Sequence, residues 1–334
     1  MKLNKCKENP ILKPNPSNQW EELCVLNPAA IEKDGKVYML YRAAGNDKTH
    51  LIYIGLATSD DGVHFKRESN KPLISGDPNG LDAGGCEDPR LVKMGDYFYL
   101  TYASRPFPPG QYWREDKEYF GFQPEFGPKV LIYNNTLTHL AVSKDLRNWK
   151  KLGPITDPHF DDRDVVIFPE KISSKFWMFS RAMERCGDGY LNKNPAIWIS
   201  SSDDLIHWDN YSLFMEGKEE WESKKIGAST PPIKTKEGWL LFYHGVSAKD
   251  DAYRVGAVLL DLNDPRKILA RTKDFIMEPE EEYETNGYYN GCVFPTGIIR
   301  KGEDLYIYYG AGDKVICLAT VNEQEFLKSL KGEK

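Results

Sequence analysis

The sequence predicts an all-β protein, a single five-bladed β-propeller domain over residues 1–334 with a short C-terminal helix. The first observation is a repeat, in which a turn containing proline leads into an apolar strand and then into an aromatic-rich strand. The second is its period, because five such units in 334 residues suit radial packing with short sheet edges. The third is composition, since 40% hydrophobic and 13% aromatic residues can fill the core of a strand-rich fold.

Each predicted unit opens with a strand led by proline and continues with a second strand rich in aromatic and aliphatic side chains. The first strands are expected to begin near Pro28, Pro89, Pro169, Pro231 and Pro295. The second strands are expected over residues 35–42, 95–102, 174–181, 237–244 and 303–310.

The first three units share a turn of the form Ser-x-Asp-x-x-x-aromatic, at residues 59–65, 143–149 and 202–208. The Ser and Asp side chains are expected to close this turn, and the aromatic ring to pack between sheets. We therefore interpret these aspartates as structural.

Two segments depart from the repeat. Residues 105–135 insert an aromatic loop into the second unit, and a long loop in a compact domain is usually functional. We expect the loop either to cover the substrate site or to form a contact between subunits of a homo-oligomer. Residues 322–330 predict a short helix with Asn322 as N-cap and acidic residues in the first turn.

Charge and cysteine usage narrow the class of protein. The net charge of −6 argues against nucleic acid as the main partner, since phosphate backbones require a basic face. Residues 1–20 are polar, so we expect neither a secretory signal nor a membrane partner. The six cysteines form no CxxC pair and predict reduced thiols, without a metal site, in a cytoplasmic enzyme.

Comparison of equivalent positions predicts where the chemistry lies. The second strands end at Arg42, Tyr102, Arg181, His244 and Gly310. Two arginines and a histidine at matched positions indicate convergence on one anion. The residues before the first-strand prolines are Asn27, Asp88, Phe168, Thr230 and Phe294. Glycines before Asp88 and proline after it make a rigid mount for a carboxylate, although Asp88 could equally cap its own turn.

Several sequence blocks together resemble glycoside hydrolase family 130, which comprises β-mannoside phosphorylases and some β-mannosidases on a five-bladed propeller. The similarity extends from about residue 27 to residue 321. The matching blocks are Gly-Cys-Glu-Asp-Pro-Arg at 85–90, and residues 163–172, 225–228, 238–245 and 293–297.

The resemblance implies a role for each matching residue. Asp88 corresponds to the general acid. Phosphate is expected to bind Arg163, Arg181, Lys225 and His244. The mannoside is expected to contact Asn27, Arg42, Glu87, Arg90, Tyr253 and Asp313. No cofactor is implied, because inorganic phosphate is a co-substrate beside the β-mannoside oligosaccharide.

The implied reaction is inverting phosphorolysis of a β-1,4- or β-1,2-linked mannoside, which yields α-mannose 1-phosphate. An acid protonates the leaving oxygen as an oxocarbenium-like state develops. Phosphate is already an anionic nucleophile, so the site needs cations rather than a base, and arginine offers bidentate geometry. Asp88 must carry a proton at working pH, with Glu87 nearby as a like charge.

Three alternatives remain at this point. A hydrolase of the same family would need a base, for which Glu170, Asp164 and Glu222 are candidates. A five-bladed glycosidase acting on arabinans or fructans would need three carboxylates from different blades, and no matching trio is found. A sugar-binding propeller without turnover would use aromatic platforms such as Tyr288, Tyr289 or Trp113.

Overall fold

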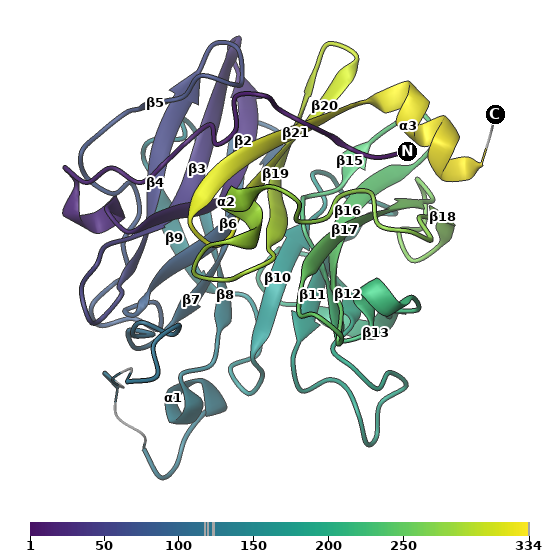
Figure 1. The fold of residues 1–334 in the computed structure, drawn as a ribbon. Coiled ribbons are helices and arrows are strands. Elements are labelled where there is room, and N and C mark those ends of the chain that lie inside the picture. Colours follow the sequence, from purple (N-terminus) through teal and green to yellow (C-terminus); the bar gives the residue numbers. More distant parts are fainter. Residues whose placement is uncertain (117, 119, 122–123, 333–334) are drawn as a thin grey trace.

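The computed structural model describes residues 1–116, 118, 120–121 and 124–332. The described chain is built mainly from antiparallel strands in four hydrogen-bonded sheets, with short helices outside them (Figure 1). The predicted all-β class is confirmed. Residues 117, 119 and 122–123 of the insertion, which include two of its aromatic residues, lie outside the described residues.

The first two predicted units form one large sheet. A single parallel bridge between Ile52 and Gly85 joins them, and the other pairings within the sheet are antiparallel. The strands of this sheet are β2 (Cys24–Lys33), β3 (Lys36–Ala44), β4 (Ile52–Ser59), β5 (Lys66–Arg67), β6 (Gly85–Met94), β7 (Tyr97–Arg105), β8 (Leu137–Ser143) and β9 (Lys150–Pro154).

The other three units form one antiparallel sheet each. The sheet of the fifth unit is completed by the N-terminal strand, which pairs with the last strand, so the two ends of the chain lie near each other (Figure 1). The third unit contains β10 (Asp162–Ile167), β11 (Phe176–Ala182), β12 (Ile197–Ser202) and β13 (Asp209–Met215). The fourth unit contains β14 (Lys225–Ala228), β15 (Ile233–Lys234), β16 (Trp239–Val246), β17 (Tyr253–Leu260) and β18 (Ile268–Arg271). The fifth unit contains β19 (Val293–Lys301), β20 (Asp304–Ala311), β21 (Val315–Asn322) and β1 (Asn4–Lys5).

The prediction that prolines begin the first strands is wrong. Pro28, Pro89 and Pro295 lie inside β2, β6 and β19, where the register shifts by a bulge. A bulge is one of the few places in a sheet that accept proline, because the missing N–H group breaks no ladder bond there. In the third unit Pro169 follows β10, and in the fourth Pro231 lies between β14 and β15.

The strand pairing also corrects one matched position. Glu87 pairs with Ala103 as Leu26 pairs with Arg42 and as Arg163 pairs with Arg181. The second-unit equivalent of Arg42 is therefore Ala103, one residue beyond the predicted Tyr102. Gly35 is the second residue of its hairpin turn, whereas Gly95 is the first residue of its own, so counting both strands from these glycines shifts the match by one.

Tyr102 instead belongs to a buried cluster that recurs in four units. In each, a buried carboxylate accepts a hydrogen bond from a tyrosine hydroxyl and pairs with a cation from another strand of the sheet. The carboxylate–tyrosine–cation sets are Glu21–Tyr41–Arg67, Asp82–Tyr102–Lys151, Glu222–Tyr243–Arg271 and Glu284–Tyr309–Lys5. Each buried carboxylate is thereby paired and hydrogen-bonded, as a charge inside a fold requires.

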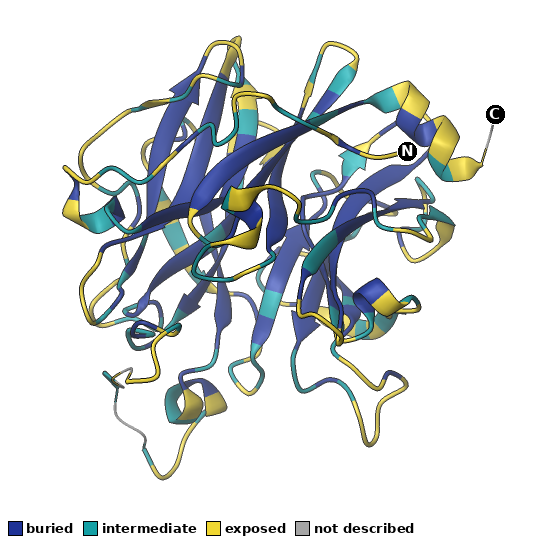
Figure 2. Cartoon of the chain, viewed as in Figure 1, coloured by how far each residue is buried: buried dark blue, intermediate teal, exposed yellow. Residues whose placement is uncertain are grey.

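The apolar core lies between neighbouring units, as the dark strands of Figure 2 show. Neighbouring units contact one another in a continuous order. β2 contacts β6, β6 contacts β10, β10 contacts β14, β16 and β17 contact β19, and β19 returns to β2. The bulged segments of these opening strands are thereby brought toward one another.

The local predictions outside the core hold. The Ser59, Ser143 and Ser202 hydroxyls bond the Asp side chains two residues on, which in turn accept backbone N–H groups. The helices are α1 (Lys129–Tyr133), α2 (Glu282–Thr285) and α3 (Glu323–Lys331). Asn322 caps α3 by accepting a bond from the Glu325 amide. Within the described residues, no helix is long and apolar enough to cross a membrane.

Candidate active site

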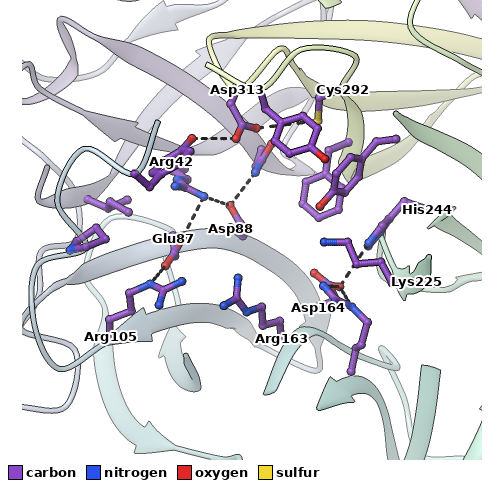
Figure 3. Close-up of a pocket in the computed structure, with 18 of the residues that line it drawn as sticks. Arg42, Glu87, Asp88, Arg105, Arg163, Asp164, Lys225, His244, Cys292 and Asp313 are labelled. Atoms are coloured by element: carbon purple, nitrogen blue, oxygen red, sulfur yellow. Dashed lines mark hydrogen bonds and ion pairs between the residues drawn. The ribbon is translucent and has the colours of Figure 1, made fainter. Parts of the chain in front are cut away.

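One cavity of about 470 Å³ gathers most of the residues that the sequence singled out. Figure 3 shows Asp88 and the cationic residues directed toward this shared space. The predicted residues that line it are Asn27, Arg42, Glu87, Asp88, Arg163, Arg181, Lys225, His244, Tyr253 and Asp313. Arg90 is the exception, because it does not line the cavity and lies behind Asp88.

Three residues that line the cavity occupy the same bulge position in their units. Asn27, Asp88 and Asp164 have φ of 44°, 52° and 54°, in the left-handed region. Asn and Asp are the non-glycine residues that adopt this conformation most readily. Because a bulge redirects its side chain, all three project into the cavity. Proline marked this position for Asn27 and Asp88, whereas Asp164 lacks a following proline.

A glycine in the fifth unit makes room for this arrangement. Gly310 ends the second strand at the position that arginine or histidine holds in other units. A Cβ atom at Gly310 would overlap the Asn27 side-chain oxygen. The series of matched cations stops here because Asn27 occupies the space.

The Asp88 carboxylate is held by two donors. Asn27 Nδ2 donates to Asp88 Oδ1 at 2.8 Å, and Arg42 Nη1 donates to the same atom at 3.0 Å. The Asp88 side chain remains 21% exposed, so a molecule in the cavity can reach it. The carboxylate is thus oriented by neighbours but not enclosed.

Glu87 is not an isolated like charge beside Asp88, as the sequence argument assumed. Arg42 lies between the two carboxylates and contacts Glu87 Oε2 at 2.9 Å, while Arg105 Nε donates to Glu87 Oε1 at 3.2 Å. Burial opposes ionisation of Glu87, but Arg42 and Arg105 outweigh it and lower its pKa. Glu87 therefore stays ionised and neutralises the arginines around it.

The cationic part of the cavity rests on two aspartates. Asp161 binds Arg163 through both oxygens, at 2.8 and 2.7 Å. Asp164 Oδ2 accepts from Arg181 Nε at 2.7 Å and lies 3.5 Å from His244 Nε2. The arginines are thereby pre-positioned before any ligand enters.

Burial weakens the charge of the other two groups. Burial, reinforced by Arg181, lowers the pKa of Lys225 to about 7. Burial, reinforced by Arg181 and Lys225, outweighs Asp164 and lowers the pKa of His244 to about 3. The His244 imidazole is therefore neutral, with Nδ1 3.1 Å from the Ser229 hydroxyl and Nε2 without a hydrogen-bond partner. An anion in the cavity would find donors whose bonding capacity is unused.

Aromatic and acidic side chains also line the cavity. Asp313 accepts a bond from the Tyr112 hydroxyl at 2.9 Å, and burial raises its pKa although Arg42 opposes this. The Tyr253 ring stacks on His244 with ring centroids 5.4 Å apart. Rings and carboxylates in this combination suit the apolar faces and hydroxyls of a sugar.

The described part of the insertion contributes directly to the cavity. Its members that line the cavity are Arg105, Pro109, Tyr112, Glu118, Tyr133 and Asn134. Trp113 packs on Tyr288 with ring centroids 4.7 Å apart, which attaches the insertion to the fifth unit. The described residues thus agree with the expected location beside the substrate site, and the expected contact between subunits stays a prediction.

Sequence reasoning missed several residues of the site. Asp161 lies just before β10 and two residues from Arg163, and in an extended segment this spacing could have indicated that they share a face. Tyr112 gave no such signal, because the path of a loop determines its position. Arg105 is the last residue of β7, and nothing in the sequence indicated its contact with Glu87.

Two of the three carboxylates considered as hydrolytic bases are not in the cavity. Glu222 belongs to the buried cluster with Tyr243 and Arg271, and Glu170 pairs with Lys234 on the surface. Asp164 lines the cavity but is bonded to Arg181. Among the described residues, no group of three or more His, Cys, Asp or Glu side chains is arranged to hold a metal ion.

Comparison with known proteins gives the family. A family model described as beta-1,4-mannooligosaccharide phosphorylase matches residues 3–117 and 130–332. The chain is 36% identical over 331 residues to a 1,2-beta-oligomannan phosphorylase of Thermoanaerobacter sp. (strain X514), covering 97% of this chain and 99% of that protein. It is 35% identical over 337 residues to a beta-1,2-mannobiose phosphorylase of the same organism, covering 97% and 98%.

A solved structure agrees. The beta-1,2-mannobiose phosphorylase from Listeria innocua, in complex with beta-1,2-mannobiose, has a TM-score of 0.80 at 27% identity and covers 100% of both chains. In this fold, a cavity in which a carboxyl group faces clustered cations is the active site of a carbohydrate-active enzyme. The chain belongs to glycoside hydrolase family 130. The predicted family and the predicted class of enzyme, a glycoside phosphorylase, are confirmed.

Proposed function

We propose that this enzyme cleaves β-1,2-linked manno-oligosaccharides with inorganic phosphate, inverting the anomeric centre to release α-mannose 1-phosphate. The observation that carries the proposal is that Asp88 and a set of four cationic-type side chains, Arg163, Arg181, Lys225 and His244, line one cavity. The linkage follows the two relatives at 36% and 35% identity, both of which are named for β-1,2-mannosides.

In the proposed reaction, Asp88 supplies a proton to the leaving glycosidic oxygen, directly or through a sugar hydroxyl, as the bond from C1 to that oxygen breaks. Phosphate, held by Arg163, Arg181, Lys225 and His244, forms the new bond to C1 from the opposite face. Asn27, Arg42, Glu87, Tyr253 and Asp313 hold the mannosyl ring. Phosphate is consumed as a co-substrate, and no cofactor takes part.

The state of the carboxylates favours phosphate over water as nucleophile. A hydrolase would need a free base near C1, yet Asp164 is bonded to Arg181 and Glu87 is paired with Arg42 and Arg105. A phosphorolytic site needs no such base.

The proposed architecture is a single domain in which the five units form a five-bladed propeller. The support for it is the continuous order of contacts from β2 through β6 and β10 to β14 of the fourth unit, from β16 and β17 of that unit to β19, and from β19 back to β2. The bulges of Asn27, Asp88 and Asp164 then surround one axis. With six free cysteines, the proposed compartment is the cytoplasm.

The products test the function. Incubated with phosphate, the enzyme is expected to convert β-1,2-mannobiose to mannose and α-mannose 1-phosphate, with the anomer assigned by NMR, and to convert β-1,4-mannobiose far more slowly. Without phosphate, turnover is expected to stop. Release of two mannose molecules at the same rate without phosphate would establish a hydrolase.

The affinity for an anion is expected to depend on pH through Lys225. Its pKa of about 7 means that the ammonium is present below that pH and is lost as the pH rises through it. Sulfate keeps its charge across the neutral range, so its dissociation constant, measured by calorimetry, is expected to increase above about pH 7. In Lys225→Met, binding should be weaker and independent of pH. A flat profile in the unmodified enzyme would contradict this assignment.

A further inference from the structure

We propose that Arg90 is a positioning residue, which holds the backbone of Asp88 in its strained conformation and links it to the histidine of the cationic cluster. This inference rests on the proposed function, in which Asp88 is the proton donor. It replaces the sequence-based expectation that Arg90 contacts the mannoside, because Arg90 is 2% exposed and does not line the main cavity.

The first step is the bond that Arg90 makes to Asp88. Arg90 Nη1 donates to the Asp88 backbone carbonyl at 2.6 Å. The register of β6 on β7 shifts between Glu87 and Arg90, and Pro89 has no N–H group to contribute. The guanidinium therefore serves a carbonyl group at the point where the sheet ladder is interrupted.

The second step is the conformation that this bond secures. Asp88 has φ of 52°, which is unfavourable for a residue with a side chain and persists only when its surroundings enforce it. The direction of the carboxyl group follows from that conformation. A donor fixed on the Asp88 carbonyl thus restrains the orientation of the acid without touching it.

The third step leads to the cationic cluster. Arg90 Nε donates to the Ser229 carbonyl at 2.6 Å, and the Ser229 hydroxyl lies 3.1 Å from His244 Nδ1. The Arg90 guanidinium also lies 5.4 Å from the centre of the Phe294 ring, which lines the cavity. One buried side chain therefore joins three units around the acid and the histidine.

The fourth step concerns the remaining nitrogen. Arg90 Nη2 is buried without a protein partner. A second cavity of about 10 Å³ is lined by Arg90, Asp88 and Asp164, together with Thr101 and Thr138. That volume suits one water molecule with polar partners, so the inference includes a water bridging Arg90 to the aspartates.

These contacts require arginine in particular. A planar guanidinium presents donors in fixed directions, so it can serve two carbonyl groups and a water at once. Lysine would keep the positive charge but offer a single nitrogen. Arg90→Lys therefore separates the geometry from the charge.

The experiment compares Arg90→Lys with Arg67→Lys. Arg67 is a matched control, since it likewise bonds a backbone carbonyl and lies 5.9 Å from the centre of an aromatic ring. Its other partner is the buried Glu21 carboxylate, and it lines neither the main cavity nor the second one. Arg90→Lys is expected to lower kcat for β-1,2-mannobiose about 10²-fold, the loss typical of a misplaced catalytic group. KM for phosphate and for mannobiose should change by less than about threefold. Arg67→Lys should keep kcat.

A second substrate identifies the step that is lost. 2,4-Dinitrophenyl β-mannoside releases 2,4-dinitrophenolate, a leaving group that needs no protonation. Arg90→Lys should therefore impair the phosphorolysis of this substrate far less than that of mannobiose. An unchanged kcat for mannobiose, equal losses on both substrates, or an equal loss in Arg67→Lys would overturn the inference. If Arg90→Lys does not fold, Arg90→Gln, which keeps one donor, is measured in the same way.

Asp88→Asn on the same two substrates separates this inference from the proposed function. If Asp88→Asn shows the selective loss and Arg90→Lys does not, only the role of Arg90 fails. If Asp88→Asn impairs both substrates equally, the assignment of Asp88 as the acid fails.

Discussion

Replacing Asp88 with asparagine is expected to lower the turnover of β-1,2-mannobiose by about 10²- to 10⁴-fold, the contribution typical of a general acid. Asparagine keeps the shape of the side chain and adopts positive φ, so the bulge should be preserved. Its amide oxygen can still accept bonds from Asn27 and Arg42, which now bond the carboxylate at 2.8 and 3.0 Å. Binding of mannobiose, measured by calorimetry, should therefore change little.

Glu118→Gln is the control for this experiment. Glu118 also lines the cavity, but it is exposed and pairs with Lys48 at 3.1 Å, away from the bulge of Asp88. Its replacement should leave turnover nearly unchanged. Near-normal turnover by Asp88→Asn would exclude Asp88 as the proton donor.

Replacing Lys225 with methionine is expected to raise KM for phosphate by about 10- to 150-fold, the equivalent of about 1.5–3 kcal/mol for a hydrogen bond to a charged group. Methionine keeps most of the length of the stem but lacks Nζ, the charged atom that lies 5.1 Å from the centroid of the Tyr253 ring. KM for mannobiose should change by less than about threefold. An interaction with phosphate that is lost equally in the ground state and the transition state raises KM for phosphate, not KM for mannobiose.

Lys224→Met provides a neighbouring control. Lys224 is exposed, pairs with Asp251 and does not line the cavity. Removing its charge should affect neither Michaelis constant. Equal increases for phosphate and mannobiose in Lys225→Met would indicate a general disturbance of the site and would argue against a phosphate pocket built on this lysine.

Much of the fold was predictable because its information is local. The aromatic-rich second strands, the Ser-x-Asp turns and the N-cap at Asn322 each depend on a few neighbouring residues, and each agrees with the structure. The starts of the first strands were not predictable from proline alone. A bulge allows Pro28 and Pro89 to lie within a ladder, and only the partner strand reveals that exception.

The site was predictable to the extent that its residues lie on matched strand ends. Arg181 and His244 emerged from the repeat itself, and their place in one cavity follows from the register. Arg90 was misplaced because its strand position does not reveal which side of the bulge its long side chain takes. Tyr112 was missed because its contact with Asp313 joins residues about two hundred positions apart, through the path of a loop.

The left-handed bulge beneath Asn27, Asp88 and Asp164 also restricts how this enzyme can evolve. Few amino acids tolerate such a backbone, and among them asparagine alone reproduces the outline of the aspartate. Genetic drift at Asp88 therefore leads most readily to a chain that still recognises its sugar but no longer cleaves it. Descendants of this lineage would become lectins more easily than they would acquire a glutamate at the same place.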